Sequence, residues 1–228
     1  MAHAFVADPE APELDEDDRH HLLRVLRVRP GEEVTVSDGA GRWRPCRMGP
    51  GGVLEPAGDV VAVPRPEPPV GVGVALTKGD RPEVAIQKLT ELGVDRIVPF
   101  VADRSVARWE GERAVRHVAR LRRVAREAAV QAQLAFLPDV TELTDFLGAA
   151  TLAGAARCDR GGAPPELDRP LLLVGPEGGW SDAERDGALP VVGLGPTILR
   201  AETAAIAAGA LLTALRAGVV VARGGSDA

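Results

Sequence analysis

The chain has 228 residues, of which 45% are hydrophobic and 26% charged, with a formal net charge of −6 at pH 7. These values are typical of a soluble globular protein with one large domain or two modest ones. With only two cysteines, Cys46 and Cys158, the composition argues against a disulfide framework and a cysteine-rich zinc site. No apolar run approaches the roughly 20 residues that cross a bilayer, and residues 1–10 lack the pattern of an export signal. We therefore expect a cytoplasmic protein with no membrane span and no bound metal.

The first 66 residues predict a small β-rich module. Residues 15–26 favour a short helix, because acidic residues stand at its start, where the helix dipole favours negative charge. Residues 32–43 read as strand, glycine-rich turn and strand. The proline-rich stretch 63–70 favours extended backbone and is typical of a linker between domains.

From residue 67 to residue 228 the pattern alternates strands and helices. We expect strands at 70–76, 96–101, 151–156, 171–174 and 191–194, and helices at 80–93, 116–133 and 201–218. Asp80 is the predicted N-cap of the first of these helices, and Gly93 its end. The alternation predicts a parallel sheet with helices on both faces, and ligands of such sheets bind at the carboxyl ends of the strands.

Two similar loops follow the last two predicted strands. "LLLVGPEGGW" (171–180) runs from a buried strand into glycines and proline, and "VVGLGPTILRAETAA" (191–205) repeats the arrangement. Ser181 and Glu184 have the spacing of a capping box, so a helix begins after the first loop. That stretch alone also fits a tight strand-to-helix turn without a ligand. The repeat favours a pocket walled by main-chain amides and carbonyls, which suits a flat heteroaromatic ligand.

"LLLVGPEGGWSDAE" together with "LGPTILRAETAAIAAGALL" resembles the signature of the SPOUT methyltransferases. More narrowly, it resembles the ribosomal RNA small subunit methyltransferase E family, and "ALTKGDRPEVAIQKLTELGVDRIVPFVADRSV" extends the match. The resemblance implies an α/β fold in two domains: a PUA-like RNA-binding barrel at 1–66 and a parallel-sheet domain at 67–228. It also implies a deep trefoil knot at about 171–215. The implied reaction is methylation of N3 of one uridine in 16S rRNA, with S-adenosylmethionine as methyl donor.

The resemblance places the methyl donor between the two loops, held mainly by main-chain atoms. The residues that it implies for this pocket are Leu173, Val174, Gly175, Pro176, Glu177, Gly178, Leu194, Gly195, Ile198, Leu199 and Arg200. A carboxylate beside the cationic sulfonium is electrostatically favourable, although Glu177 equally suits a cap of the following helix.

The reaction needs a nucleophilic N3, so the enzyme must stabilise the uracil anion or remove its proton. Arg200 is the first candidate, because its permanent charge suits a developing negative charge on a uracil oxygen. Binding of a phosphate is the alternative role. Glu202 is a candidate proton acceptor, but a carboxylate in the first helical turn also compensates the helix dipole.

The arginine-rich segments and the family likeness predict contacts with RNA despite the acidic net charge, because binding depends on where cations lie. The candidates are His21, Arg24, Arg27, Lys78, Arg104 and Ser105. Each of them also fits an ordinary solvated position. The segment "VQAQLAFLPDV" (130–140) departs from the family pattern of Glu-Gln-Ser-x-Arg, which makes the RNA substrate less secure than the methyl donor.

The small-residue face of the last helix, at Ala204, Ala205, Ala208 and Gly209, suits close helix packing. The family likeness implies a homodimer through this helix, although the same face would serve inside one chain. Two other functions remain open: methylation of another RNA, and a non-catalytic RNA-binding or ribosome-assembly role.

Overall fold

The computed structural model describes residues 1–79 and 81–221. The chain divides into two compact units, one made of Met1–Arg65 with Arg126–Leu137 and the other of Pro66–Ala125 with Pro138–Ala228. Asp80, the expected N-cap, lies outside the described residues.

The first unit is built on a five-stranded sheet with the order β1-β2-β3-β4, in which β5 also pairs with β3. β1 runs parallel to β2, and the other pairs are antiparallel. The strands are β1 (Ala2–Phe5), β2 (Glu33–Ser37), β3 (Arg42–Met48), β4 (Leu54–Pro56) and β5 (Val61–Ala62). The helical parts are α1 (Glu16–His20), a π-helical turn η1 (His21–Val25) and a 3-10 turn η2 (Pro50–Gly52).

The predicted helix at 15–26 is present as α1 followed by η1. Asp15 caps it, since its side chain accepts a hydrogen bond from the amide of Asp18 at 2.7 Å. Leu22 is fully buried among Val34, Cys46 and other residues of the sheet. Val34 and Val36, alternate residues of β2, are buried in the same cluster as Leu22.

Residues 130–137 pack within this first unit. The sequence does not predict this packing. Phe136 lies under the guanidinium of Arg65 at 4.6 Å, and a Cβ at Gly41 would come within 2.5 Å of the phenyl ring. Leu137 packs against Gly39, and the carbonyl of Leu134 accepts a hydrogen bond from the Ser37 hydroxyl at 3.3 Å. Phe136 and Leu137, which follow the residues that depart from the family pattern, thus fill space against the β2–β3 turn.

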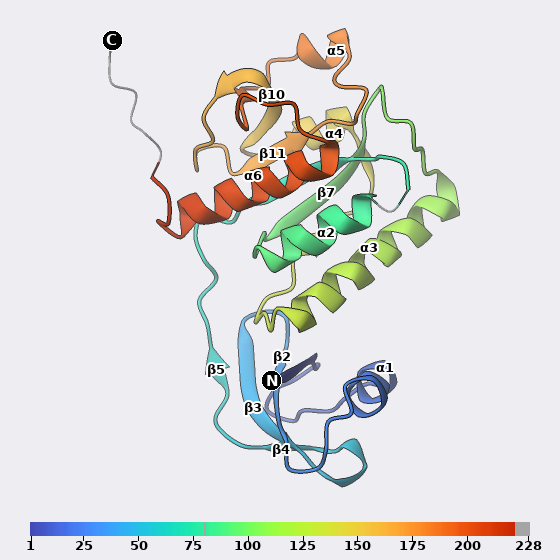
Figure 1. Ribbon diagram of the computed structural model, residues 1–228, viewed down its shortest axis with the longest axis vertical. Coiled ribbons are helices and arrows are strands. Elements are labelled where there is room, and N and C mark those ends of the chain that lie inside the picture. The colour runs from blue at the N-terminus through green and yellow to red at the C-terminus, as the bar shows by residue number, and fades with distance from the viewer. Residues whose placement is uncertain (80, 222–228) are drawn as a thin grey trace. The chain divides into compact units, whose positions relative to one another are not determined.

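The second unit is a parallel sheet with the order β12-β10-β11-β6-β7-β8, in which β9 also pairs with β7 (Figure 1). Every pair in it is parallel. The strands are β6 (Gly71–Ala75), β7 (Arg96–Val101), β8 (Asp139–Val140), β9 (Thr144–Asp145), β10 (Ala155–Ala163), β11 (Leu171–Val174) and β12 (Val191–Val192). The helices are α2 (Arg81–Glu91), α3 (Gly111–Gln131), α4 (Phe146–Ala150), α5 (Asp182–Arg185) and α6 (Ala201–Arg216). The last residues of α3, from Arg126 onward, belong to the first unit.

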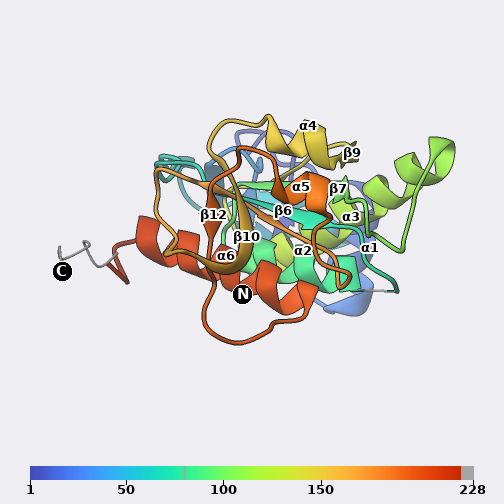
Figure 2. The same cartoon turned by 90° about the horizontal axis from the view of Figure 1, so that it is seen from above.

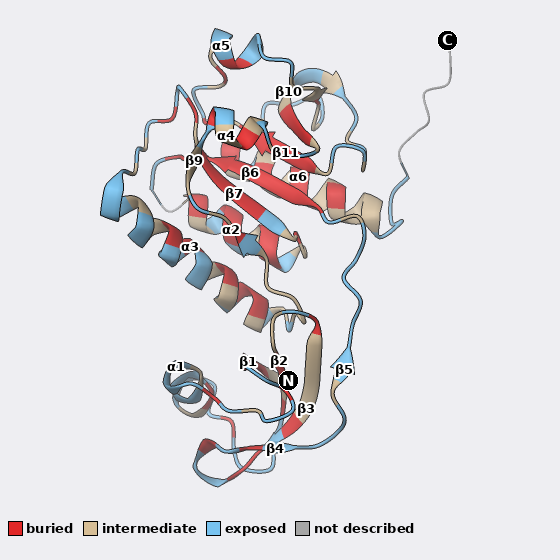
Figure 3. Ribbon diagram, turned by 180° about the vertical axis from the view of Figure 1, so that it is seen from behind, coloured by how far each residue is buried: buried red, intermediate tan, exposed pale blue. Residues whose placement is uncertain are grey.

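Helices cover both faces of this sheet, as predicted. Figure 2 shows α4 on one face and α2 with α6 on the other. Alternate residues of each strand serve the two faces: Val72 and Leu172 pack under α2 and α6, whereas Leu171 and Leu173 face the α4 side. Figure 3 shows the central strands buried along their length, which explains why "LLLV" is continuously apolar.

The alternation of large and small residues in β6 has a direct steric cause. A Cβ at Gly73 would lie 2.4 Å from Cδ2 of Leu173, and one at Gly71 would lie 2.9 Å from Cδ1 of Leu171. Glycine at these two positions therefore makes room for the leucines of the neighbouring strand.

Several bounds in the second unit differ from expectation. The helix expected at 116–133 begins at Gly111, and the strand expected at 191–194 is only Val191–Val192. The strand predicted at 151–156 begins only at Ala155, after a turn, and continues to Ala163. The small-residue face of α6 packs inside the chain, which is one of the two uses that the sequence allows, since Ala205 and Ala208 are fully buried and a Cβ at Gly209 would lie 2.5 Å from Cδ2 of Leu89.

Candidate functional site

A cleft of about 440 Å³ opens where β11 and β12 end and beside the later part of β10. This volume lies within the range of about 300–1,000 Å³ of small-molecule sites. Its lining residues are Cys158, Asp159, Arg160, Val174, Gly175, Pro176, Glu177, Gly179, Trp180, Arg185, Leu194, Gly195, Thr197, Ile198, Leu199, Arg200, Ala201 and Ala204. Both glycine–proline loops contribute, as the sequence predicts.

The first loop packs against the side chain of Trp180. The indole stacks on Phe100 with ring centroids 6.1 Å apart, and its N–H donates to the carbonyl of Cys158 at 2.8 Å. A Cβ at Gly175 would come within 2.9 Å of the indole Cε2. Glycine at 175 thus allows the main chain to contact the tryptophan, because a Cβ would collide with the indole.

Glu177 forms an ion pair with Arg81, the first residue of α2. It does not cap the helix after the loop, because Ser181 and Glu184 complete the predicted capping box of α5. Both side chains of the ion pair are partly exposed, so the pair orients the carboxylate at the cleft more than it stabilises the fold.

Residues 195–198 of the second loop are exposed to solvent. Gly195 has a φ of 132°, a left-handed conformation that favours glycine. Ile198 is 80% exposed although it is a large apolar residue at the cleft. Arg200 occupies the N-cap position of α6, where its side chain makes no capping bond, and it is exposed.

Glu202 lies in the first turn of α6 and does not line the cleft. Its Oε2 atom is buried and has no hydrogen-bond partner within residues 1–79 and 81–221. A buried carboxylate oxygen without a partner is unfavourable in a folded chain. This burial distinguishes Glu202 from a solvent-exposed carboxylate at the start of a helix.

All but two of the predicted cofactor residues line the cleft. Leu173 is fully buried on the α4 side of the sheet. Gly178 faces away toward Arg104, whose guanidinium donates to its carbonyl at 3.4 Å. Because neighbouring strand residues point to opposite faces, Val174 reaches the cleft and Leu173 does not.

The sequence reasoning missed the contribution of β10 to the cleft. Cys158, Asp159 and Arg160 lie just beyond the strand predicted at 151–156. The carboxyl ends of parallel strands meet at one edge of a sheet, so the position of these residues after a predicted strand could have indicated that they line the cleft. The other unforeseen lining residues, Gly179, Trp180, Arg185, Thr197, Ala201 and Ala204, adjoin the two predicted loops.

The ionisation of Cys158 is suppressed. Burial, together with the neighbouring charge of Asp159, raises the pKa of this thiol to about 12. The thiol therefore stays protonated and serves as a small apolar wall of the cleft, not as a nucleophile.

The RNA candidates of the second unit lie at the same sheet edge. Lys78 follows β6 and Arg104 follows β7, and both are exposed. Ser105 is only 6% exposed, and its hydroxyl accepts the amide of Ala102 at 3.1 Å. The structure thus gives Ser105 an internal, loop-shaping position.

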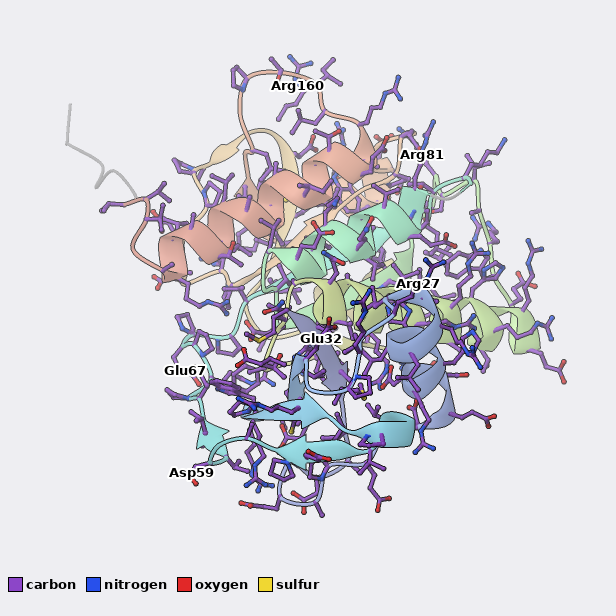
Figure 4. The ribbon with its side chains drawn as sticks, turned by 60° about the horizontal axis from the view of Figure 1, so that its bottom comes forward. Arg27, Glu32, Asp59, Glu67, Arg81 and Arg160 are labelled. Carbon is purple, nitrogen blue, oxygen red and sulfur yellow. The ribbon has the colours of Figure 1, made fainter. Side chains whose placement is uncertain are left out.

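The RNA candidates of the first unit, His21, Arg24 and Arg27, are all exposed around the η1 turn. The amide of Val28 donates to the carbonyl of Leu22 at 2.9 Å, which closes the turn and places Arg27 at a φ of 57°. Glycine is the usual residue at such a position. Figure 4 labels Arg27 there, and Arg81 and Arg160 in the second unit.

Within the part of the chain that the structure describes, no group of three or more histidine, cysteine, aspartate or glutamate residues could hold a metal ion. No helix among these residues is long and apolar enough to cross a membrane.

Two family comparisons agree with this architecture. Residues 65–213 match the RNA methyltransferase domain family, and residues 14–53 match the RNA methyltransferase PUA domain family. The fold and its cleft therefore define the class, an RNA methyltransferase with an N-terminal PUA domain.

Curated relatives identify the family within this class. The ribosomal RNA small subunit methyltransferase E of Mycobacterium bovis is 36% identical over 217 residues, covering 86% of this chain and 83% of its own. The protein of the same name from Synechocystis is 31% identical and covers 94% of this chain and 78% of its own. The chain belongs to the ribosomal RNA small subunit methyltransferase E family.

Solved structures share the fold. The ribosomal RNA small subunit methyltransferase E of Neisseria gonorrhoeae, bound to S-adenosylmethionine, has a TM-score of 0.78 and 28% identity. That match covers 94% of this chain and 98% of the other. A methyltransferase of Legionella pneumophila with S-adenosylmethionine bound has a TM-score of 0.80 and 25% identity, covering 94% of this chain and 97% of its own.

Proposed function

We propose that this chain transfers a methyl group from S-adenosylmethionine to N3 of one uridine in 16S rRNA of the small ribosomal subunit, in the cytoplasm. One observation carries the proposal: two glycine–proline loops form a cleft of ligand size at the carboxyl edge of a parallel sheet. The relatives named for methylation of small-subunit RNA support the choice of substrate.

The residues of the cleft fit the methyl donor. Gly175 and Gly195 leave main-chain atoms accessible for hydrogen bonds to an adenine ring, while Val174, Leu194 and Ala204 supply apolar contacts. S-adenosylmethionine supplies a methyl group made electrophilic by the sulfonium charge. Glu177, oriented by Arg81, places a carboxylate on the cleft wall, where it favours a cation.

Activation of the uridine falls to the start of α6. Arg200 is exposed at the cleft, makes no capping bond and carries a permanent charge, so it suits stabilisation of negative charge on a uracil oxygen. Glu202 stays our candidate for the proton acceptor: its Oε2 lacks a partner among the described residues, although the side chain is not part of the cleft lining. The alternative for Arg200 is a contact with an RNA phosphate.

RNA binding is proposed for two exposed groups of cations. Lys78 and Arg104 lie at the sheet edge that bears the cleft, and His21, Arg24 and Arg27 lie around the η1 turn. A left-handed arginine at position 27 costs about 1 kcal/mol or more relative to glycine, which favours a role for its side chain. Ser105 belongs to the proposal only as a residue that shapes the loop of Arg104.

Two further expectations belong to the same proposal. The first is the trefoil knot at about 171–215, and the second is a homodimer through α6. The buried Ala205 and Ala208 serve packing inside the chain, so a dimer would use the remaining face of that helix.

The test is methylation of purified small subunits from a strain that lacks the enzyme, with free 16S rRNA in parallel, followed by mapping of N3-methyluridine. We expect one methylated uridine. Methylation confined to another RNA would support the second candidate function. Absence of both methylation and S-adenosylmethionine binding would support a non-catalytic RNA-binding or ribosome-assembly role.

A further inference from the structure

The cleft contains a second charged pair that the proposed function leaves unused. Nη2 of Arg185, at the end of α5, lies 3.4 Å from Oδ2 of Asp159 on β10. Both residues line the cleft. The aspartate side chain is 21% exposed and the arginine side chain 49%, so the pair faces the opening without being fully solvated.

The carboxylate of this pair is held in place by its surroundings. Oδ1 of Asp159 accepts the amide of Arg160 at 2.9 Å, which leaves Oδ2 directed to Arg185. The indole N–H of Trp180 binds the carbonyl of Cys158 and thereby fixes the β10 segment beside the first cleft loop. A carboxylate fixed by such contacts loses little freedom when it binds a cation.

The guanidinium side is positioned by α5. This short helix carries the capping box of Ser181 and Glu184, and Oε1 of Glu184 also accepts the amide of Asp103 at 2.9 Å. The buried Arg157 donates to the carbonyl of Glu184 at 2.5 Å. Helix α5 is therefore tied to both β10 and the loop after β7, and Arg185 projects from a fixed backbone.

Of the remaining charged residues on the cleft wall, Glu177 and Arg200 have other assignments, and Arg160 is exposed. Glu177 is paired with Arg81, and Arg200 stands at the start of α6 for the substrate. The Asp159–Arg185 pair thus offers an adjacent acceptor and donor with opposite charges. That arrangement matches an α-amino acid, whose ammonium and carboxylate groups are joined to one carbon.

We propose that Asp159 and Arg185 bind the amino-acid end of the methyl donor, Asp159 holding its ammonium group and Arg185 its carboxylate. This inference rests on the proposed function and adds to it the residues that read the methionine tail. The glycine loops bind the adenosine end, so the two ends of the ligand are recognised by different chemistry: main chain for one and an ion pair for the other.

The test compares two neutral thioethers by titration calorimetry. S-adenosylhomocysteine carries the amino-acid tail, and 5′-methylthioadenosine has the same adenosine without it. A hydrogen bond to a charged group contributes about 10- to 100-fold in affinity. We expect Asp159→Asn and Arg185→Gln each to weaken S-adenosylhomocysteine by at least about tenfold, and to change 5′-methylthioadenosine less than about twofold.

The matched control is Asp186→Asn, because Asp186 is exposed beside Arg185 and does not line the cleft. It should leave both affinities unchanged. Thermal unfolding verifies that the variants fold, and asparagine still offers an oxygen to the amide of Arg160. Equal weakening of both ligands, or no weakening of either, overturns the inference and leaves the proposed function standing. If the wild-type chain binds neither ligand nor S-adenosylmethionine, the proposed function fails together with the inference.

Discussion

Gly175 and Trp180 are in such close contact that a single added methyl group would bring Cβ within 2.9 Å of the indole Cε2. The indole is itself fixed by Phe100 and by the carbonyl of Cys158. The floor of the cleft therefore depends on glycine at this position, and the contact has a measurable consequence.

Gly175→Ala should lower the free energy of unfolding by about 1–3 kcal/mol, as overpacking of a close contact does. It should also weaken S-adenosylmethionine by more than about tenfold, which corresponds to 1.4 kcal/mol, because the loop must move to relieve the clash. Denaturant unfolding and calorimetry measure the two effects. Gly187→Ala is the control, since its Cβ would meet only the carbonyl of Glu184 at 3.7 Å. Wild-type affinity in the 175 variant would contradict this role of the glycine.

Glu177→Gln tests the electrostatic role of the Arg81–Glu177 pair. The substitution removes a negative charge from the cleft wall, so it should weaken S-adenosylmethionine about fivefold. S-adenosylhomocysteine lacks the sulfonium charge, and its affinity should stay nearly constant. The stability should change by less than about 1 kcal/mol because both partners are partly exposed. Equal losses for the two ligands would mean that Glu177 acts by shape or hydrogen bonding instead.

Arg200→Ala separates a role in the chemistry from a role in RNA binding. If Arg200 stabilises charge on the uracil, kcat for methylation of small subunits should fall about 100-fold or more, with little change in KM. Glu202→Gln should lower kcat comparably if Glu202 accepts the proton, while S-adenosylmethionine still binds. A raised KM with unchanged kcat in the Arg200 variant would assign this residue to a phosphate contact.

His3 predicts a pH dependence of stability that is independent of catalysis. Burial lowers the pKa of this ring to about 4, and the charge of Arg126 acts in the same direction. The unfolded ring takes up its proton near pH 6.5, so folding stability is full above that pH and falls as the pH decreases toward 4. The loss should reach about 2–3 kcal/mol at pH 4.5 relative to pH 7.5.

The measurement is denaturant unfolding of the wild-type chain and of His3→Gln at both pH values. Other titrating groups, Asp18 among them, contribute to both proteins and cancel in the difference. A wild-type pH dependence equal to that of the variant would show that the folded ring titrates near its ordinary pKa.

Local sequence patterns predicted what depends on local structure. The two glycine–proline loops, the capping box of Ser181 and Glu184, and the strand 171–174 are present because each is determined by a few neighbouring residues. The prediction that Leu173 lines the cleft differs from its position in the structure. The tertiary fold decides which face of β11 meets the ligand, and that face belongs to Val174.

Long-range contacts were beyond the reach of the sequence. The partner of Glu177 is Arg81, 96 residues away. The contribution of β10 was missed because "RCDRGGA" lacks the apolar pattern of a strand, although it continues β10 to Ala163. The apolar segment 130–137 also gained its explanation only from contacts with distant residues such as Gly39 and Arg65.

The trefoil knot and the homodimer stay predictions. The domain limits of 1–66 and 67–228 also stay a prediction. The compact units of the structure divide the chain differently, because Arg126–Leu137 joins the first unit.

Calorimetric titration of the intact wild-type chain with S-adenosylmethionine addresses the cleft most directly. We expect saturable binding of one donor per chain and its competition by S-adenosylhomocysteine. Heat changes no larger than those of dilution, at donor concentrations up to the millimolar range, would contradict it.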